Sequence, residues 1–206
     1  MINFFIDSAT SLATLALLKD EKIIEKIVIT SSNDLSTTIF EFIEKLFFKN
    51  NIVPADIDCI YISIGPGSFT GIRIGVTIAK TFAWARKIKI ITLSSLEIMA
   101  TTSSNSKYNI PIIDARRGYV YAGIYDNNMN NIMEDQYIKL DDLVKKNNNK
   151  DTIFITNDNL IDGSILPDIN IEKIVLKHQF DQSLNPHMVN PNYLKITEAE
   201  ANINND

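Results

Sequence analysis

The chain has 206 residues, of which 45% are hydrophobic and 22% are charged, a composition that excludes an intrinsically disordered protein. Its apolar runs are too short to span a bilayer and no basic leader opens the sequence, so we expect a cytoplasmic protein with no membrane association. The single cysteine, Cys59, excludes an internal disulfide bond, and its apolar neighbours predict a buried thiol.

The net charge of −5 is unevenly distributed. Residues 1–103 carry ten Lys/Arg and ten Asp/Glu, whereas residues 104–206 carry ten Lys/Arg and fifteen Asp/Glu. No face rich in lysine and arginine is evident from the sequence, which argues against strong direct binding of a polyanion. A folded surface can nevertheless gather charges that are dispersed along the chain.

The N-terminal region predicts a meander of three β-strands at residues 4–7, 12–18 and 23–30. The first of these strands is continuously apolar until it meets Asp7, and a charged turn separates the second strand from the third. After the third strand the hydrophobic period changes to that of a helix.

A long amphipathic helix is predicted from Asp34, as its N-cap, to about Lys49. Phe40 and Phe47 widen its apolar arc to about 160° at 100° per residue, whereas packing on one sheet needs little more than about 100°. The excess aromatic surface of Phe40, Phe47 and Phe48 predicts a second contact, either with a partner or beneath the second half of the chain. The stripe that we expect in the core consists of Leu35, Ile39, Phe42, Ile43 and Leu46.

The next elements complete the first half of the chain. Ser94 and Glu97 have capping-box spacing and open a short helix, and residues 103–106 predict a domain boundary. Before them we expect a buried strand, a glycine-rich loop, a helix and a further strand, at residues 59–64, 65–71, 72–86 and 88–93.

The second half predicts a similar but smaller unit. The alternation of antiparallel and parallel strands indicates an α/β fold, with mixed sheets flanked by helices and with lobes at residues 1–103 and 104–206. The pattern weakens from residue 157 onwards, and the tail after Glu198 is predicted to fray. The expected strands are residues 110–113, 119–125, 132–140 and 152–156, and the expected helix is residues 141–146.

The glycine-rich loop Gly65-x-Gly67-x-x-x-Gly71 joins a strand to a helix, an arrangement that can aim backbone N–H groups at a phosphate. It matches neither the dinucleotide pattern G-x-G-x-x-G nor a P-loop, because the Gly-Lys-Ser/Thr is absent. We therefore favour a tight turn that brings the helix close to the sheet. Asp7 likewise suits either a metal-facing or phosphate-facing acid or a turn former.

Two further groups of residues could carry chemistry. His178 and His187 lack a metal-ligand pattern such as H-x-x-x-H and have no recognisable nucleophile beside them, so we predict no metal site. Asp114, Arg116 and Arg117 could hold a carboxylate or a phosphate, but a hairpin turn with solvated charges is the favoured interpretation.

Residues 65–75, Gly-Pro-Gly-Ser-Phe-Thr-Gly-Ile-Arg-Ile-Gly, resemble without a break the signature G-P-G-S-F-T-G-[IVL]-R-[IV]-G of the TsaB (YeaZ) family. Further segments resemble the family in order along the chain: residues 5–10 its I-D-T-A-T, residues 94–97 its V-S-S-L-E, residues 113–121 its D-A-R-x-G-E-V-Y and residues 191–195 its P-x-Y-L-R.

The resemblance implies an actin-like fold (ASKHA, ribonuclease H-like) of two related lobes. The chain departs from the family at Tyr119, where Glu is usual, and at residues 176–190, which look shortened, so we expect a reduced second lobe and doubt the usual late helix. The implied function is a non-catalytic scaffold that binds and supports the transferase TsaD together with the ATPase TsaE, while TsaC supplies threonylcarbamoyl-adenylate. The complex would add threonylcarbamoyl to adenosine 37 of tRNAs that read codons beginning with A, with tRNA bound to this chain only indirectly.

The resemblance also implies that the first two helices contact TsaD or a second copy of the chain. This subunit alone would need no cofactor, and ATP or ADP is a candidate ligand of the complex. The residues predicted to contact the partner are Leu35, Ile39, Phe40, Ile43, Phe47, Val76, Ala79, Lys80 and Ala83. The candidate nucleotide contacts around the signature loop, at the partner interface, are Asp7, Gly65, Gly67, Ser68, Thr70, Gly71 and Arg73.

Two other functions are weighed against the scaffold. Asp7 and the glycine loop also suit an actin-like small-molecule kinase using ATP, which needs a metal-bound nucleotide and a catalytic base. Stabilisation of the isolated protein by ATP and magnesium, with release of phosphate, would favour the kinase. A peptidase has no support in the sequence, because no nucleophile–base pair can be assembled.

Overall fold

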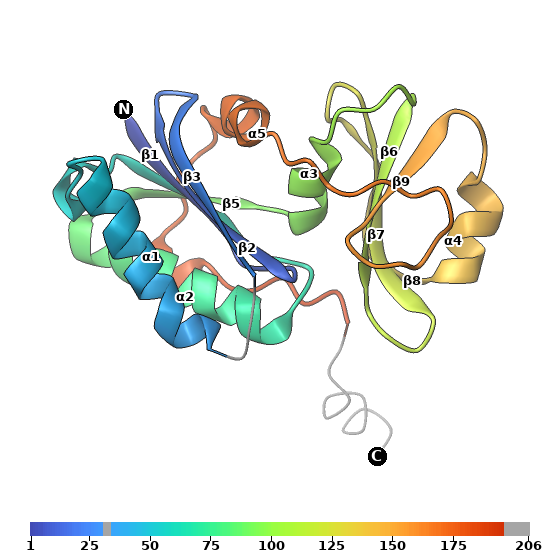
Figure 1. Cartoon of the computed structure of the whole chain (residues 1–206), viewed down its shortest axis with the longest axis horizontal. Helices are drawn as coiled ribbons and strands as arrows, with labels where there is room; N and C mark the ends of the chain where they lie inside the picture. The colour runs from blue at the N-terminus through green and yellow to red at the C-terminus, as the bar shows by residue number, and fades with distance from the viewer. Residues whose placement is uncertain (31–33, 196–206) are drawn as a thin grey trace, which may run out of the picture.

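The computed structural model describes residues 1–30 and 34–195. Two β-sheets lie side by side and form two lobes, and the C-terminal part of the chain returns to the first lobe (Figure 1). Within the described residues, every helix is too short or too polar to cross a membrane. The prediction for the tail after Glu198 lies outside the described residues.

The first sheet has five strands in the order β3-β2-β1-β4-β5. The antiparallel meander β1–β2–β3 is extended by β4 and β5, which run parallel to β1 and to each other. Cys59 is buried in β4, as predicted, and burial raises the pKa of its thiol to about 12. The bounds are Ile2–Asp7 for β1, Leu12–Lys19 for β2, Lys22–Thr30 for β3, Cys59–Ser63 for β4 and Lys89–Leu93 for β5.

Helices cover both faces of the first sheet, because side chains on its central strands alternate between two apolar clusters. Phe4 and Ile6 of β1 face α1 and α2, whereas Phe5 faces α3 and α5 on the other side. The bounds are Leu35–Lys49 for α1, Phe69–Arg86 for α2, Ser95–Ala100 for α3 and Ile171–His178 for α5, with 3₁₀ turns at Pro54–Asp56 and Pro186–Met188.

The second sheet repeats the strand order of the first without its fifth strand: β8-β7-β6-β9 corresponds to β3-β2-β1-β4. Its outer face is covered by α4, which packs on a separate apolar cluster. The two lobes are therefore related in topology, and the second is reduced, as predicted. The bounds are Tyr108–Asp114 for β6, Tyr119–Asp126 for β7, Asn131–Lys139 for β8, Thr152–Ile155 for β9 and Leu140–Asn147 for α4.

The chain after β9 does not stay in the second lobe. Lys22 and Glu172 form an ion pair at 2.7 Å, and the backbone N–H of Ile90 donates to Ser183 Oγ at 3.0 Å. Farther along, the Asn192 N–H donates to the carbonyl of Ile64 at 2.7 Å. The predicted second domain, residues 104–206, thus contains a long segment that belongs to the first lobe.

Two helix starts differ in detail from the prediction. The second long helix begins at Phe69 rather than Ile72, because Ser68 Oγ accepts the N–H of Gly71 at 3.2 Å and caps it. Asp34 precedes α1, but its side chain makes no capping hydrogen bond.

The third helix start keeps only half of the predicted capping box. Ser94 Oγ accepts the N–H of Glu97, whereas the Glu97 carboxylate accepts from Lys177 at 2.6 Å and contacts His178 Nε2 at 3.1 Å. Burial raises the pKa of Glu97 less than these two partners lower it, so the net direction is downward. The carboxylate therefore ties α3 to α5 instead of closing its own cap.

Candidate functional site

The glycine-rich loop between β4 and α2 is filled by the protein's own backbone. The N–H of Ser68 donates to the carbonyl of Ala9 at 2.7 Å. A Cβ on Gly67 would lie 2.1 Å from the oxygen of Ala9, and a Cβ on Gly71 would lie 2.0 Å from the oxygen of Ser8. The glycines thus let the loop and α2 press against the β1–β2 turn, which is the tight-turn interpretation favoured from the sequence.

Asp7 lies beneath this loop, and its side chain points into the protein. The residue is 2% exposed, and Asp7 Oδ1 accepts the N–H of Ala9 at 3.0 Å. Burial raises the pKa of Asp7, although hydrogen bonds from Ala9 and Ser63 offset part of the shift. An enclosed carboxylate of this kind favours the turn-forming interpretation, and the role of Asp7 as a metal-facing or phosphate-facing acid stays a prediction.

An open cleft of about 660 Å³ lies between the two lobes. Three of the predicted loop residues, Gly67, Ser68 and Thr70, line its first-lobe wall, whereas Asp7, Gly65, Gly71 and Arg73 do not. The second-lobe wall combines apolar residues of β6 with Tyr121 and with side chains of both charges, and Lys195 of the returning C-terminal segment adds a further cation: Ile112, Ile113, Ala115, Asp114, Arg116 and Asp158.

The hairpin turn after β6 supplies part of this second-lobe wall. Asp114 Oδ1 accepts the N–H of Arg116 at 2.8 Å, and Arg116 and Arg117 both have positive φ. The side chains of all three residues are exposed, which agrees with the predicted turn.

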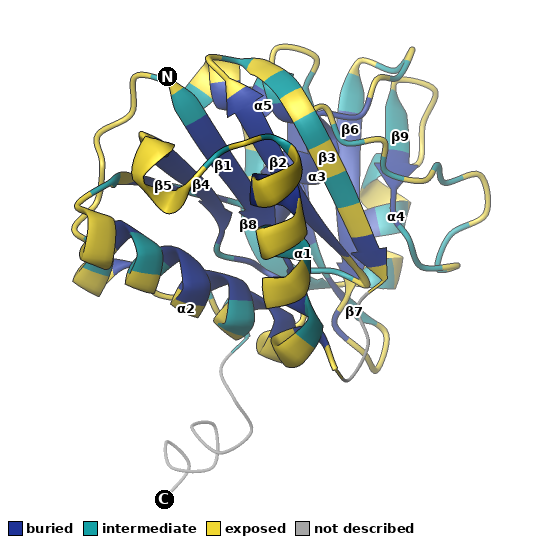
Figure 2. Ribbon diagram, turned by 60° about the vertical axis from the view of Figure 1, so that its left-hand side comes forward, coloured by how far each residue is buried: buried dark blue, intermediate teal, exposed yellow. Residues whose placement is uncertain are grey.

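The outward face of α1 is exposed (Figure 2) and carries large apolar residues. Phe40 is 59% exposed and Phe48 is 84% exposed. Phe47 is instead buried, with its ring centroid 5.2 Å from that of Phe4 and 6.1 Å from that of Phe82. The prediction that Phe47 docks a partner is therefore wrong: its ring packs under α2 within the first lobe.

Most of the other residues predicted to contact a partner are also core residues. Phe40 is exposed, whereas Ile43 and Lys80 are partly buried and reach the surface. The structure buries the remaining members of the set, which are Leu35, Ile39, Phe47, Val76, Ala79 and Ala83. Periodicity places a residue on one side of a helix, but only the position of the neighbouring helix decides where the buried arc ends.

Metal ligands do not converge among residues 1–30 and 34–195, where no group of three His, Cys, Asp or Glu side chains could hold an ion. His178 faces Glu97 and Asp181, with its Nδ1 2.6 Å from Asp181 Oδ2. His187 lies against Trp84, with their ring centroids 6.3 Å apart. Both histidines thus have contacts within the first lobe.

Comparisons with known proteins match the chain to one family model and to curated relatives. The family model TsaD, tRNA N6-adenosine threonylcarbamoyltransferase, matches residues 23–180. The chain is 29% identical to the tRNA threonylcarbamoyladenosine biosynthesis protein TsaB of Bacillus subtilis (strain 168), over 95% of either chain.

Solved structures agree in fold. YeaZ from Pseudomonas aeruginosa matches 94% of this chain and 100% of its own, with a TM-score of 0.76 and 19% identity. A second structure, described as an uncharacterized protein with similarity to peptidase YEAZ from Pseudomonas aeruginosa, gives a TM-score of 0.78 at 18% identity, over 94% of this chain and 99% of its own. The fold is therefore the actin-like α/β fold that the sequence predicts.

Proposed function

The chain belongs to the TsaB (YeaZ) family, and we propose that it is a non-catalytic scaffold subunit in the synthesis of threonylcarbamoyladenosine on tRNA. In this proposal it binds TsaD, which performs the transfer, and supports it together with TsaE. The name of the Bacillus subtilis relative supports the pathway. The scaffold role rests on the exposed surface of α1 and on the closed signature loop.

The observation that carries the proposal is the exposed aromatic face of α1. Phe40 and Phe48 leave large apolar area in water, and such surfaces on soluble proteins generally mark contacts with other proteins. Ile43 and Lys80, which are partly exposed on α1 and α2, lie within the predicted contact set. We therefore assign TsaD to the outer surface of these two helices.

The match to a TsaD family model also supports this pairing. Related chains with related folds can meet through equivalent surfaces, as the two copies in a twofold dimer do. A second copy of this chain is consequently the competing occupant of the same helices, and sedimentation of the isolated chain distinguishes it from TsaD.

The non-catalytic assignment has a separate support in the signature loop. Ser68 uses its N–H for Ala9, and Asp7 is enclosed beneath the loop, so neither group is available in this conformation for a phosphate or a bound metal. The alternative of an actin-like kinase using ATP therefore has no specific observation in its favour.

The test is a double substitution on α1, Phe40→Glu with Phe48→Glu. We expect it to weaken the affinity for purified TsaD at least about tenfold in calorimetry, because both rings become charged at the interface. The midpoint of urea unfolding should stay unchanged, because both side chains are exposed. Phe47→Glu is unsuitable, because it would place a charge in the core.

The matched control is Phe180→Glu, which charges a ring that is 89% exposed and that follows α5, the helix on the opposite face of the first sheet from α1. It should leave TsaD affinity unchanged. Sedimentation of the isolated chain reports whether the α1 substitutions also dissolve a homodimer. Unchanged TsaD affinity in the double variant, or normal threonylcarbamoyladenosine in tRNA from cells depleted of the protein, would contradict the proposal.

A further inference from the structure

Three tyrosines form a ladder on the side of the second sheet that faces the cleft. Tyr119 and Tyr121 are two residues apart on β7 and therefore share one face of the sheet. Tyr137 of β8 is the register partner of Tyr121. The rings of Tyr119 and Tyr137 are stacked, with centroids 4.6 Å apart and an interplanar angle of 6°. The Tyr121 and Tyr137 centroids are 5.9 Å apart. All three residues are partly exposed, so the ladder forms part of the surface.

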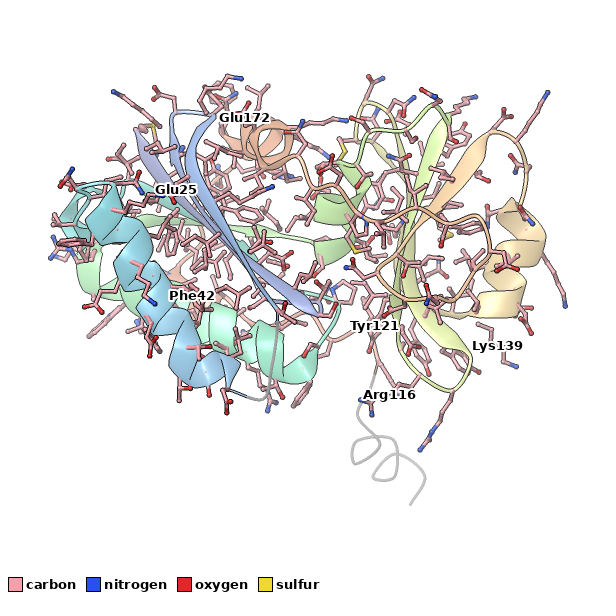
Figure 3. The ribbon with its side chains drawn as sticks, in the orientation of Figure 1. Glu25, Phe42, Arg116, Tyr121, Lys139 and Glu172 are labelled. Carbon is pink, nitrogen blue, oxygen red and sulfur yellow. The ribbon has the colours of Figure 1, made fainter. Side chains whose placement is uncertain are left out.

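Two lysines lie against rings of this ladder, and an arginine lines the same cleft. Lys139 Nζ lies 5.9 Å from the ring centroid of Tyr119, and Lys195 Nζ lies 5.6 Å from that of Tyr137. Arg116, from the turn between β6 and β7, lines the same cleft as Tyr121 and Lys195. Figure 3 shows Arg116, Tyr121 and Lys139 toward the same end of the second lobe.

These three cations are not neutralised within the part of the chain that the structure describes. Neither Arg116, Lys139 nor Lys195 forms an ion pair with a carboxylate among residues 1–30 and 34–195. The half of the chain that holds them nevertheless carries an excess of acidic residues. The fold has therefore gathered positive charge that lacks an ion-pair partner in the described residues beside partly exposed aromatic rings, within the acidic half of the chain.

The first lobe contributes a second aromatic pair at the same cleft. Phe69, which lines the cleft, stacks on Tyr193 with centroids 4.9 Å apart, and each residue is 42% exposed. Arg73 lies over the Phe69 ring at 3.6 Å. Because Tyr193 lies two residues before Lys195, the C-terminal segment joins this pair to the tyrosine ladder.

We propose that the tyrosine ladder with Arg116, Lys139 and Lys195 binds single-stranded RNA directly. Aromatic rings provide faces on which unpaired bases stack, and nearby cations attract the phosphates, which is how nucleic acids are held when sequence matters little. The proposal goes beyond the scaffold role, which requires no RNA contact from this chain. It revises the expectation that tRNA reaches the chain only indirectly.

Two carboxylates in the cleft decide how such a strand would lie. Asp114 and Asp158 line the wall beside the ladder and repel phosphates, so the RNA backbone should follow the cations along β7 and β8. Carboxylates can also accept hydrogen bonds from the exocyclic amino groups of bases. Bases therefore turn toward the cleft and phosphates toward its rim.

The experiment measures fluorescence anisotropy of a labelled RNA hairpin with an unpaired loop, titrated with the isolated full chain at about 50 mM salt. The same stem closed as a blunt duplex is the comparison, and it should bind more weakly because its bases are not free to stack. The double variant Lys139→Gln with Lys195→Gln should weaken hairpin binding about tenfold. Its salt slope should fall by about 1.4, at about 0.7 for each phosphate that the variant no longer neutralises.

Two controls distinguish the loss of this surface from a change in net charge and from the loss of any one aromatic ring. Lys145→Gln with Lys146→Gln removes the same charge from the exposed side of α4 and should leave binding nearly unchanged. Tyr119→Leu should weaken hairpin binding without changing the salt slope, whereas Tyr108→Leu, at the start of β6, should not.

Three results would overturn the proposal. They are equal binding of hairpin and duplex, equal weakening by the two lysine double variants, and the absence of hairpin binding at about 100 μM protein. The last result would assign the surface to a protein partner instead. None of these measurements depends on TsaD, so the RNA proposal and the scaffold proposal can fail separately.

Discussion

Asp7 and Asp114 occupy equivalent places in the two lobes and have opposite surroundings. Each ends the first strand of its sheet, β1 or β6, and each uses Oδ1 to accept the N–H two residues later. Asp7 is 2% exposed, whereas Asp114 is exposed and lines the cleft. Similar sequences, Ile-Asp-Ser-Ala and Ile-Asp-Ala-Arg, thus give one enclosed and one open carboxylate.

The difference comes from the segment after the fourth strand of each lobe. In the first lobe, β4 leads into the glycine loop and α2, whose glycines let the backbone close over Ser8 and Ala9. In the second lobe, β9 leads into an irregular segment with Asn157 and Asp158 on the cleft wall. The signature loop therefore covers the end of β1 in the first lobe. The second lobe has no such cover in its described residues, and it supplies most of the charged side chains that line the cleft.

The largest effect on stability should come from a substitution that forces α2 and the signature loop away from the β1–β2 turn. Gly71→Ala places a Cβ 2.0 Å from the backbone oxygen of Ser8, a clash that only a shift of α2 can relieve. We expect the free energy of unfolding to fall by about 3 kcal/mol or more, measured by urea denaturation. The control is Gly163→Ala, where nothing lies within 4 Å and the cost is only that of its φ of +78°, about 1 kcal/mol.

Equal free energies of unfolding for Gly71→Ala and Gly163→Ala would contradict the proposed difference between a covered first lobe and an open second lobe. That outcome would mean that α2 can move away from the β1–β2 turn at little cost. The loop could then open to a ligand, and the enclosure of Asp7 would not be an obstacle to binding.

An intermediate effect should come from the carboxylate under the cover. Because burial raises the pKa of Asp7 above its ordinary value of 3.8, the folded state favours the protonated form. The stability that Asp7 contributes is therefore fully present at low pH and is lost as pH rises through the raised pKa. Asp7→Asn keeps an oxygen for the Ala9 N–H and cannot ionise, so its stability relative to wild type should increase over this range.

The measurement is urea denaturation of wild type and Asp7→Asn from about pH 4 to pH 8. Asp114→Asn changes the same turn in the open lobe and serves as the structural control. A difference between wild type and Asp7→Asn that stays constant with pH would show that burial does not disfavour the ionised carboxylate. Asp7 and Asp114 would then differ in exposure but not in how readily their carboxyl groups ionise.

Most of the fold could be predicted from the sequence, because its strands carry local signals. Most strands of the described residues coincide with an apolar run or an alternation that can be recognised without knowledge of the neighbouring strands, and β8 is the weakest case. The helix α5 escapes prediction because it lies in the segment after residue 157, where the pattern weakens, and its signal is limited to Ile171, Ile174 and Val175 with Asn170 as the N-cap. The return of this helix to the first lobe depends on tertiary contacts that no local pattern specifies.

The candidate surfaces were less predictable, because each depends on several segments at once. Phe40 and Phe47 border the same stripe of α1, and only the rings of Phe4 and Phe82 decide that Phe47 is the buried one. The tyrosine ladder and its cations come together only through the register of β7 and β8 and through the C-terminal segment that brings Lys195 to Tyr137. Counting charge along the chain could not reveal this cluster, since its cations are widely separated in sequence.

The smallest effect should come from Arg73, the signature residue that fastens the C-terminal segment beside the cover. Its Nε donates to the hydroxyl of Tyr193 at 2.8 Å, and its guanidinium lies 3.6 Å from the centroid of the Phe69 ring. Arg73→Gln should lower the free energy of unfolding by about 0.5–1 kcal/mol, the usual range for an exposed cation–π contact. Tyr193→Phe keeps the stacked ring and removes only the hydroxyl, so it should cost less. Equal decreases in stability would mean that the hydrogen bond alone holds the segment. If neither substitution lowered the stability, Arg73 would be available to bind a ligand. The first-lobe loop would then not be closed by its own contacts, contrary to the comparison of the two lobes.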